Sequence, residues 1–285
     1  MSTRMRLLPA VLLVTALAVT GCGKPGTDTD PATGAAPGTI TAGTLMIGSQ
    51  QSYIPGEFRK EGGDDLVGFG VDIVTETGKR LGLTPQWVQS DYAALITGLQ
   101  SRRFDMGSGG MSVNPARLEQ VDMVGYYRSG ATFLVRKADE GKYTTAEQMC
   151  GRKLGMLEGS TTLEKAVAAL CPGNPIQIEY YTATPLGLQG LLSERVTAYA
   201  PDLAQAQYIV EQNPAEFATT GYHLVDYLIN FTFAKGGDTA LRDAVYRTLD
   251  EMIKDGTYAK ILESWNLSTG GLTQPAYNGD LTGKP

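Results

Sequence analysis

The order in which strand-like and helix-like segments follow one another is the feature that most restricts the fold of this chain. From Thr39 to Leu267, short apolar runs such as TLMIGSQ alternate with amphipathic segments such as GVDIVTETGKRLGL. This alternation predicts an α/β architecture with mostly parallel sheets. It starts again near residue 140, which predicts two lobes. Because ligands of open α/β sheets bind beyond the carboxyl ends of strands, we expect a site in the crevice between the lobes.

The first 21 residues have the pattern of a secretory signal. Arg4 and Arg6 supply the positive start, and Leu7 to Val19 form an apolar run that is too short for a membrane span. The run ends in VTGC, which resembles a bacterial lipobox, in which the cysteine becomes the lipid-bearing first residue. We therefore predict that Cys22 is lipidated and that the protein is extracytoplasmic, anchored to the bacterial cell membrane. A cleavable signal without a lipobox is the alternative.

The segments that flank the body have a different composition from it. Residues 22–38 are rich in Gly, Pro, Thr and Asp and poor in large apolar residues, so they cannot bury enough surface to offset their ordering entropy. We expect a flexible tether there and a flexible tail over residues 269–285. The body between them spans roughly 230 residues, enough for one large domain or two modest lobes.

The charge of the chain excludes one class of partner. The sequence has 24 Lys and Arg against 30 Asp and Glu, a formal net charge of −6, and removal of the signal with its two arginines makes the charge about −8. An acidic surface repels phosphate groups, so we expect no nucleic-acid partner.

Two cysteines remain if Cys22 carries lipid. In an oxidising compartment Cys150 and Cys171 would most often pair, closing a loop of about 20 residues worth about 3 kcal/mol in the chain-entropy model. Two buried free thiols are the alternative.

Candidate site residues lie at strand ends in the first half of the chain. Gly109, Gly110 and Ser112 follow the strand predicted for FDMGSGG, and Arg117 comes five residues later. Glycines let backbone N–H groups face a ligand, and arginine binds planar anions through two parallel hydrogen bonds. These groups together would make a carboxylate receptor. The alternative for Arg117 is a solvated charge at the start of a helix.

The second half contains a comparable set. LEGSTTLE places Gly159, Ser160, Thr161 and Thr162 between a predicted strand and a predicted helix. Hydroxyl groups there can cap the helix, or its free N–H groups can accept an anion. Asp202, at the end of VTAYAPD, can hold an ammonium group or cap the next helix. The residues alone leave both alternatives open.

Six segments of the body share the pattern of one known family. They are LVGFGVDIVTETGKRLG at 66–82, DYAALITGLQSRRFDM at 91–106, GGMSVNPARLEQVDM at 109–123, YYRSG at 126–130, LGMLEGST at 154–161 and DGTYAKILESW at 255–265. In this order they resemble the bacterial extracellular solute-binding proteins of family 3, the amino-acid receptors of ABC importers. The resemblance covers the whole body, about residues 39–267.

The resemblance implies an α/β, two-lobed periplasmic-binding-protein-like (type II) fold with a hinge and an interlobe ligand cleft. Lobe 1 would comprise residues 39–131 and 232–268, and lobe 2 residues 132–231, with crossovers near 131 and 231. Such a receptor captures a free, polar amino acid by hinge closure and delivers it to an ABC permease with its cytoplasmic ATPase. It is expected to be a monomer without cofactor or metal, contacting the membrane only through its lipid.

The resemblance also implies roles for the candidate residues. Arg117 would clamp the α-carboxylate of the ligand with help from Gly110, Ser112 and Thr161, and Asp202 would take the α-ammonium group. Further ligand contacts are implied at Tyr53, Tyr92, Gly109, Leu157 and Ser160.

Departures from the family pattern bear on the ligand. Many members that bind cationic side chains carry Asp where this chain has Gln50, which favours a neutral polar ligand such as glutamine. Gly56 replaces a frequent aromatic residue and suggests a roomier pocket. Glu57 and Glu158 fall near the cleft, where either could favour a basic or amide side chain, but we expect both to face water.

Two other functions are consistent with this scaffold. A few relatives are secreted, cyclohexadienyl-dehydratase-like enzymes, and catalysis would need a positioned acid or base. The only histidine, His223, is distant from the motifs, and the chain lacks GxSxG, HExxH and CxxC patterns. We therefore expect no catalytic residue and no enzyme activity. A sensor component that presents ligand to a membrane partner would use the same binding body.

Overall fold

A computed structural model describes residues 38–60, 62–237, 239–283 and 285. The predicted signal, Cys22 and residues 22–37 of the predicted tether lie outside the described residues.

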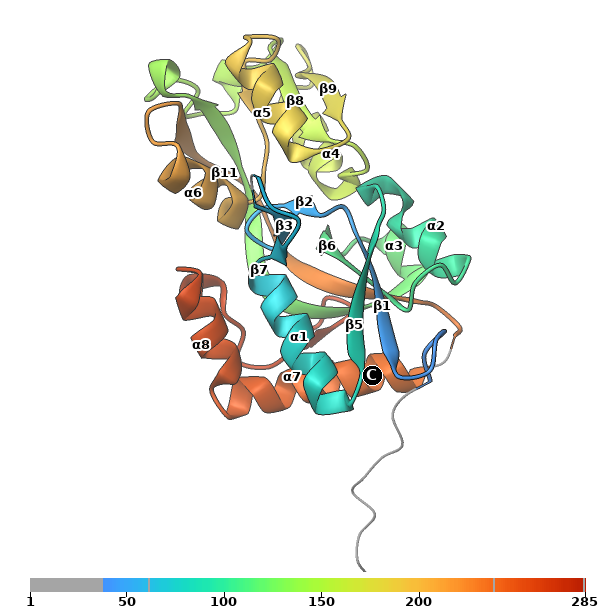
Figure 1. The fold of residues 1–285 in the computed structure, drawn as a ribbon. Helices are drawn as coiled ribbons and strands as arrows, with labels where there is room; N and C mark the ends of the chain where they lie inside the picture. Colours follow the sequence, from blue (N-terminus) through green and yellow to red (C-terminus); the bar gives the residue numbers. More distant parts are fainter. Residues whose placement is uncertain (1–37, 61, 238, 284) are drawn as a thin grey trace, which may run out of the picture. The chain divides into compact units, whose positions relative to one another are not determined.

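One sheet of nine strands forms the framework of the described chain (Figure 1). Its strands follow one another in the spatial order β5-β1-β6-β11-β7-β10-β8-β9, and β12 pairs with β7. Their bounds are β1 Thr44–Ser49, β5 Thr84–Gln89, β6 Met106–Ser112, β7 Val121–Arg136, β8 Lys153–Leu157, β9 Gln177–Tyr181, β10 Ala198–Tyr199, β11 Phe217–Ala234 and β12 Ala276–Tyr277.

A second, three-stranded antiparallel sheet lies beside this framework, and helices pack around both sheets. The small sheet consists of β2 Ser52–Tyr53, β3 Glu57–Arg59 and β4 Leu66–Val67. The α-helices are α1 Phe69–Leu81, α2 Leu95–Gln100, α3 Pro115–Leu118, α4 Thr161–Ala168, α5 Thr184–Leu192, α6 Leu203–Gln212, α7 Thr239–Lys254 and α8 Thr257–Ser264. The 3₁₀ turns are Tyr92–Ala94, Lys137–Asp139, Glu147–Met149 and Ser268–Gly270.

Two long antiparallel strands, β7 and β11, join the two lobes (Figure 1). Lobe 1 contains β1, β5, β6 and one half of each long strand, whereas lobe 2 contains β8, β9, β10 and the other halves. Pairing is parallel between β1 and β5 and between β8 and β9, but antiparallel along the long strands. The sheet is therefore mixed and not mostly parallel as predicted. The chain enters lobe 2 along β7 and returns beside it along β11, so these two strands run in opposite directions.

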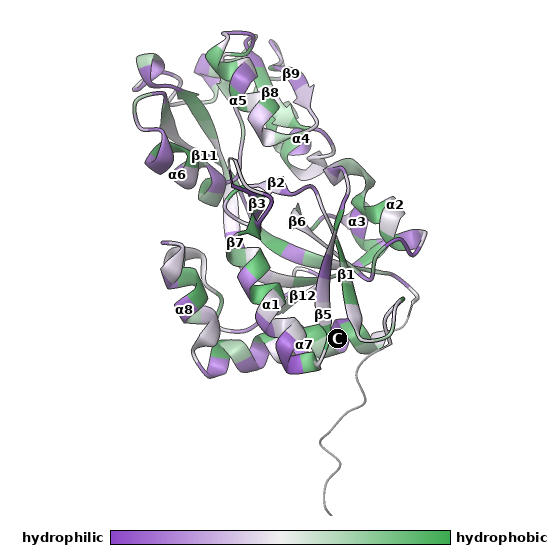
Figure 2. Ribbon diagram, in the orientation of Figure 1, coloured by the Kyte–Doolittle hydropathy of each residue, from purple (hydrophilic) through white to green (hydrophobic). Residues whose placement is uncertain are grey.

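The burial and hydropathy of the residues in each element follow the position of that element in the fold. Strand β1 lies between two other strands, is largely buried and is mostly hydrophobic in Figure 2, whereas β5 at the sheet edge alternates exposed with half-buried residues. Helix α1 buries Phe69, Ile73 and Val74 and ends at Leu81, with Gly82 as its C-cap. Gly82 adopts a left-handed conformation at φ 66°, and its N–H group caps the helix.

Each lobe has its own buried apolar cluster. The lobe 1 cluster includes Leu45, Ile73 and Phe231 and takes in residues of α7 and α8. The lobe 2 cluster includes Phe133 and Met156 and packs against α4. A further cluster in lobe 2 joins β7, α5, β10 and α6 through Leu134, Leu191, Val196, Tyr199, Ile209 and Phe217.

The two crossovers lie at one level of the sheet. Ala131 of β7 faces Val225 of β11, and Ala131 also bridges to Asp202 of lobe 2. The second crossover therefore lies earlier in the chain than the predicted residue 231. Phe231 already packs in the lobe 1 cluster and pairs with Val124, because β11 is a long strand that runs from Phe217 to Ala234.

The C-terminal segment is ordered against lobe 1, so the prediction of a flexible tail is wrong for its described residues. Strand β12 pairs with β7 at Val124 and Gly125, and Ala276 is fully buried. Asn278 accepts a hydrogen bond from the Met123 N–H group at 2.7 Å. In lobe 2, β10 covers the corresponding edge of β7. In lobe 1, β12 satisfies backbone groups that would otherwise be unpaired.

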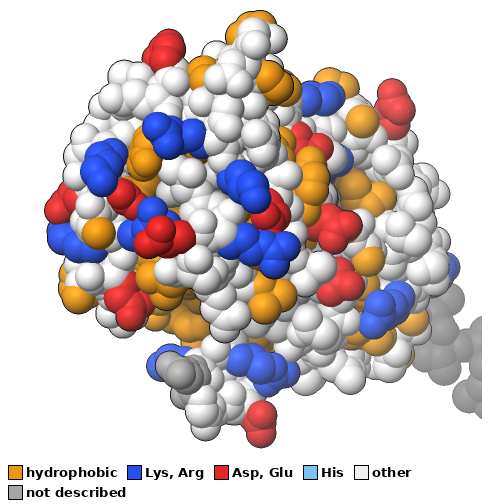
Figure 3. All heavy atoms as spheres, turned by 90° about the horizontal axis from the view of Figure 1, so that it is seen from above, with side chains coloured by type: hydrophobic (Ala, Val, Ile, Leu, Met, Phe, Trp, Pro, Cys, Tyr) orange, Lys and Arg blue, Asp and Glu red, His pale blue; other side chains and the backbone are white. Residues whose placement is uncertain are grey.

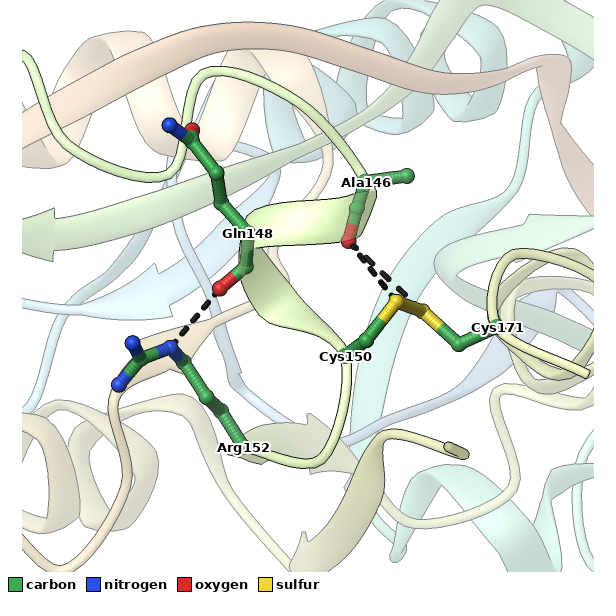
Figure 4. Close-up of a disulfide and its surroundings, with 5 residues drawn as sticks. All are labelled: Ala146, Gln148, Cys150, Arg152 and Cys171. Atoms are coloured by element: carbon green, nitrogen blue, oxygen red, sulfur yellow. Dashed lines mark hydrogen bonds between the residues drawn. A yellow bond between two sulfur atoms is a disulfide. The ribbon is translucent and has the colours of Figure 1, made fainter. Parts of the chain in front are cut away.

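Cys150 and Cys171 form the predicted disulfide, with an S–S distance of 2.03 Å (Figure 4). Both sulfur atoms lie against the Ala146 carbonyl oxygen, and the Arg152 Nε group donates to the Gln148 carbonyl oxygen at 2.8 Å. The bridge ties the segment that precedes β8 to the segment after α4. It thus links two elements that enclose the lobe 2 cluster, of which Cys171 is a member.

The described surface carries charges of both signs. On the face shown in Figure 3, acidic and basic side chains are interspersed, and hydrophobic side chains lie scattered between them. Among the described residues, no helix combines the length and the apolar character that crossing a bilayer requires.

Candidate ligand-binding site

A polar cavity of about 50 Å³ lies between the two lobes. Arg117 and Thr161 line an adjoining groove, which shares Tyr92 with the cavity. The cavity itself is lined by eight of the ten predicted ligand contacts, namely Tyr53, Tyr92, Gly109, Gly110, Ser112, Leu157, Ser160 and Asp202.

The glycines at the end of β6 form one wall of this cavity. Gly109 and Gly110 have φ values of 153° and 77°, conformations that L side chains rarely adopt. A Cβ atom on Gly110 would come within 2.8 Å of the Tyr53 ring. Glycine here therefore lets the backbone approach the tyrosine closely.

Arg117 is held by a short local motif. Asn114 caps the one-turn helix α3 by accepting from the Arg117 N–H group at 3.0 Å, and Pro115 occupies the first turn. The guanidinium group is buried and donates to the Ser112 carbonyl oxygen at 2.6 Å and to its hydroxyl at 3.0 Å. It also donates to the Gly159 carbonyl oxygen of lobe 2 at 2.7 Å. Arg117 thus connects the cavity wall to the opposite lobe and is not a solvated charge.

Hydroxyl groups at the start of α4 cross the cleft and do not cap their own helix. The Ser160 side chain makes no capping hydrogen bond. Thr162 accepts from the Ser112 hydroxyl at 2.9 Å, and Thr161 accepts from the Asn114 amide at 2.9 Å. These bonds join lobe 2 to lobe 1, so the structure shows the lobes in a closed arrangement.

Asp202 lies on the lobe 2 side of the cavity and caps α6. Its Oδ1 atom accepts from the Gln205 N–H group at 2.8 Å. Burial raises the pKa of this carboxyl group to about 6, although the N–H group of Gln205 opposes the shift. The group is a helix cap and also a cavity-lining carboxylate, so the two interpretations are compatible.

Tyrosines surround this carboxylate. Burial, and secondarily the charge of Asp202, raise the pKa of Tyr53 and of Tyr227 well above the usual value of a phenol. The Tyr53 hydroxyl is buried and makes no well-formed hydrogen bond within the described chain. A neutral hydroxyl beside Asp202 is therefore available to a ligand.

Gln50 directly follows β1 and lines the same cavity. Its side chain is 4% exposed, and neither its amide nitrogen nor its amide oxygen has a hydrogen-bond partner among the described residues. A buried amide without partners costs free energy, which a ligand with matching groups would recover.

The two glutamates near the cleft have different environments. Glu158 is exposed, as predicted, but Glu57 is fully buried, so the prediction that it faces water is wrong. The Glu57 carboxyl group accepts from the Ser108 hydroxyl and packs against Gly70. Burial raises its pKa to about 8, although the Ser108 hydrogen bond opposes the shift. Glu57 does not line the cavity.

We predict that Glu57→Gln stabilises the fold at alkaline pH. Between pH 4.5 and about 8 the folded chain retains a proton on Glu57 that the unfolded chain has released, so stability falls as pH rises through this interval. The amide should remove that loss and raise the free energy of unfolding at pH 8 by about 1–3 kcal/mol, with little change near pH 4.5. Urea titrations at both pH values, with the exposed Glu158→Gln as control, measure the difference. A wild-type pH slope that persists in Glu57→Gln would contradict the assignment.

Several residues that line the cavity were not predicted from the sequence. Four of them are close to Asp202 in the chain: Tyr199, Ala200 and Pro201 directly precede it, and Gln205 lies one turn after it. Their proximity to this strand end could have identified them as cavity residues. Tyr227 has no local signal, because it comes from β11, more than twenty residues away in the chain.

This arrangement defines a class of protein: a two-lobed binder of small ligands, with a buried carboxylate on one lobe and an arginine on the other. Comparisons with known proteins agree. The chain is 28% identical over 224 residues to the L-cystine-binding protein TcyJ of Escherichia coli, covering 78% of this chain and 82% of the relative.

Solved structures show the same fold. An ancestral arginine-binding protein bound to arginine superposes with a TM-score of 0.71 at 32% identity, covering 78% of this chain and 98% of that protein. A second structure of such a protein, bound to glutamine, gives the same TM-score and identity and covers 79% and 98%. The sequence of residues 45–268 matches the family model of the bacterial extracellular solute-binding proteins, family 3. The chain belongs to this family.

Proposed function

We propose that this protein is a lipid-anchored, extracytoplasmic receptor that captures a free polar amino acid by closure of its lobes and delivers it to an ABC permease. The observation that carries the proposal is the cavity between the lobes, where Asp202 lies on one side and the wall attached to Arg117 on the other. The names of the relatives, which bind cystine and arginine, support an amino-acid ligand.

The two charged groups fit the two ends of a zwitterion. Asp202 offers a carboxylate to an α-ammonium group, and Arg117 offers a fork of donors to an α-carboxylate, together with Ser112 and the N–H groups at Gly110. Because each group belongs to a different lobe, a ligand that contacts both stabilises the closed state over the open one.

The side chain of the ligand is proposed to be neutral and polar. Gln50 offers an NH₂ group as donor and a carbonyl oxygen as acceptor, and among the described residues Asp202 is the only carboxylate that lines the cavity. A carboxamide such as that of glutamine matches both groups of Gln50, whereas a cationic side chain would lack a second negative partner.

The site favours binding over catalysis. Asp202, the cavity's carboxylate, already accepts a helix-capping hydrogen bond, and His223 lies on the exposed side of β11 outside the cavity. Anchoring through Cys22 follows from the lipobox alone. A ligand-presenting sensor would use the same cavity, and deletion of the partner permease would distinguish the two roles by loss or retention of uptake.

A thermal-shift screen of the purified protein tests the proposal. The protein is first unfolded and refolded to remove bound solute, and then mixed with each of the twenty amino acids and prephenate. An amino acid at 100 times its dissociation constant should add about 2.7 kcal/mol of stability. A shift with prephenate alone, or with no amino acid, would contradict the proposal.

We predict that Gln50→Asp changes the preferred ligand. The new carboxylate should favour a cationic side chain, so the affinity ratio of arginine to glutamine should rise by about tenfold or more, as measured by calorimetry. Gln89→Asp is the matched control, because Gln89 donates to the Gln50 carbonyl oxygen but does not line the cavity. An unchanged ratio in Gln50→Asp would remove Gln50 from the side-chain site.

A further inference from the structure

The hairpin formed by β2 and β3 reaches from lobe 1 to lobe 2, and its Tyr53 lines the ligand cavity. Ile54, in its turn, packs against the lobe 2 cluster that contains Leu134 and Tyr199. The hairpin is anchored in lobe 1 by Glu57, which accepts from Ser108 of β6. It is braced internally by Arg59, which donates to the Gln51 side chain at 2.8 Å. A braced hairpin of this kind holds its side chains in fixed positions relative to lobe 1.

Phe58 is the aromatic residue of β3, and it lies between the two lobes. Its ring meets the ring of Tyr208, on α6 of lobe 2, edge-on with centroids 5.6 Å apart. On lobe 1 it meets Trp265 with centroids 6.2 Å apart, and the Trp265 indole donates to Asp72 of α1 at 2.7 Å. Phe58 is 7% exposed, so closure of the lobes keeps this ring out of water.

This aromatic contact is separate from the ligand site. None of Phe58, Tyr208 and Trp265 lines the cavity. The opposite seam of the cleft differs, because its cross-lobe hydrogen bonds involve Ser112 and Arg117, which are predicted to touch the ligand. The Phe58–Tyr208 contact can therefore be removed without altering a predicted ligand contact.

We propose that the Phe58–Tyr208 contact is a latch that sets the equilibrium between open and closed lobes independently of which ligand is bound. The proposal rests on the proposed function, in which capture occurs by lobe closure. Opening the cleft would separate the two rings and expose Phe58 to water, so the contact stabilises the closed state with or without ligand. Apparent affinity scales with the closed fraction, so loss of the latch weakens every ligand by the same factor.

Tyr208→Ala tests the latch, because Tyr208 is half-buried and its removal leaves Phe58 and the hairpin anchor in place. Calorimetry should show about three- to tenfold weaker binding of each amino acid that binds the wild type, with the ratios between ligands unchanged. Tyr208→Phe should retain wild-type affinity, because it keeps the ring. Tyr222→Ala is the matched control, since Tyr222 stacks on Phe133 and packs against the lobe 2 cluster.

A measurement without ligand keeps the test independent of the proposed function. Spin labels at the exposed positions Lys79 of lobe 1 and Arg195 of lobe 2 report the interlobe distance. In Tyr208→Ala the ligand-free distance distribution should shift toward the open state, whereas Tyr222→Ala should leave it unchanged. A wild-type distribution in Tyr208→Ala would overturn the latch even if no amino acid binds. Losses of affinity that differ between ligands would overturn its independence from the ligand.

Discussion

Asp202→Asn is expected to weaken amino-acid binding by about 2–5 kcal/mol, from about thirtyfold to several thousandfold in dissociation constant. The ammonium group of the ligand would lose its ionic partner inside a buried cavity, where water cannot replace it. Asparagine retains the oxygen that accepts from the Gln205 N–H group and is itself a favourable N-cap, so α6 and the fold should persist. Calorimetry of the variant, with its melting temperature as the control for folding, measures the effect.

Two further readouts separate an ionic role from a structural one. Because the pKa of Asp202 is raised to about 6, wild-type affinity should fall about tenfold between pH 7 and pH 5 as the carboxylate takes up a proton. Asp202→Asn should abolish this dependence. The variant should also lose the preference for an amino acid over its α-hydroxy acid analogue. A variant that keeps wild-type affinity and pH profile would exclude Asp202 from the ammonium site.

Arg117→Met is the second substitution for which we expect a loss of about 2–5 kcal/mol in ligand binding. Methionine keeps an unbranched apolar chain beside Tyr92, over whose ring the guanidinium group lies at 5.7 Å, but it removes the charge and the donors. The α-carboxylate of the ligand would then be buried without a cationic partner. Calorimetry with an amino acid and with its carboxamide measures the effect, because the wild type should favour the acid strongly and the variant should not.

Arg117→Lys separates charge from geometry in the same experiment. Lysine retains the charge but cannot make two parallel bonds to a planar anion, so we expect an intermediate affinity. Arg117 also donates to carbonyl oxygens of Ser112 and Gly159, and some loss of stability is expected in both variants. If Arg117→Met still prefers the acid over the carboxamide, the carboxylate is bound elsewhere.

Much of the site was predictable because its parts are local. The glycines near the end of β6, the Asn-Pro turn that presents Arg117 and the carboxylate that ends the segment before α6 each lie within a few residues of a strand end. Strand ends of an α/β sheet converge on the cleft, so the glycines and Asp202 line one cavity and Arg117 lines the groove beside it. The sequence could not decide whether Asp202 caps a helix or contacts the ligand, because Asp202 both caps a helix and lines the cavity.

Other features depend on contacts that no local pattern encodes. Strand β11 has mixed polarity because part of it covers the hinge and part lies in a core, so its first half was not recognised as a strand. Glu57 has the sequence neighbourhood of a surface loop, yet it is buried where β3 meets β6. The C-terminal segment resembles a loose tail in composition, yet it is ordered by the free edge of β7.

The sequence by itself determined the alternation of strands and helices, the strand-end residues and the two cysteines, because helices, turns and strand ends depend on neighbours within a few positions of the chain. Only the tertiary structure decided the level of the crossovers, the burial of Glu57, the unpartnered amide of Gln50 and the contact between Phe58 and Tyr208. Each of these results from packing between segments far apart in the chain. Such packing depends on how whole elements fit together in space, which the order of residues within one element does not specify.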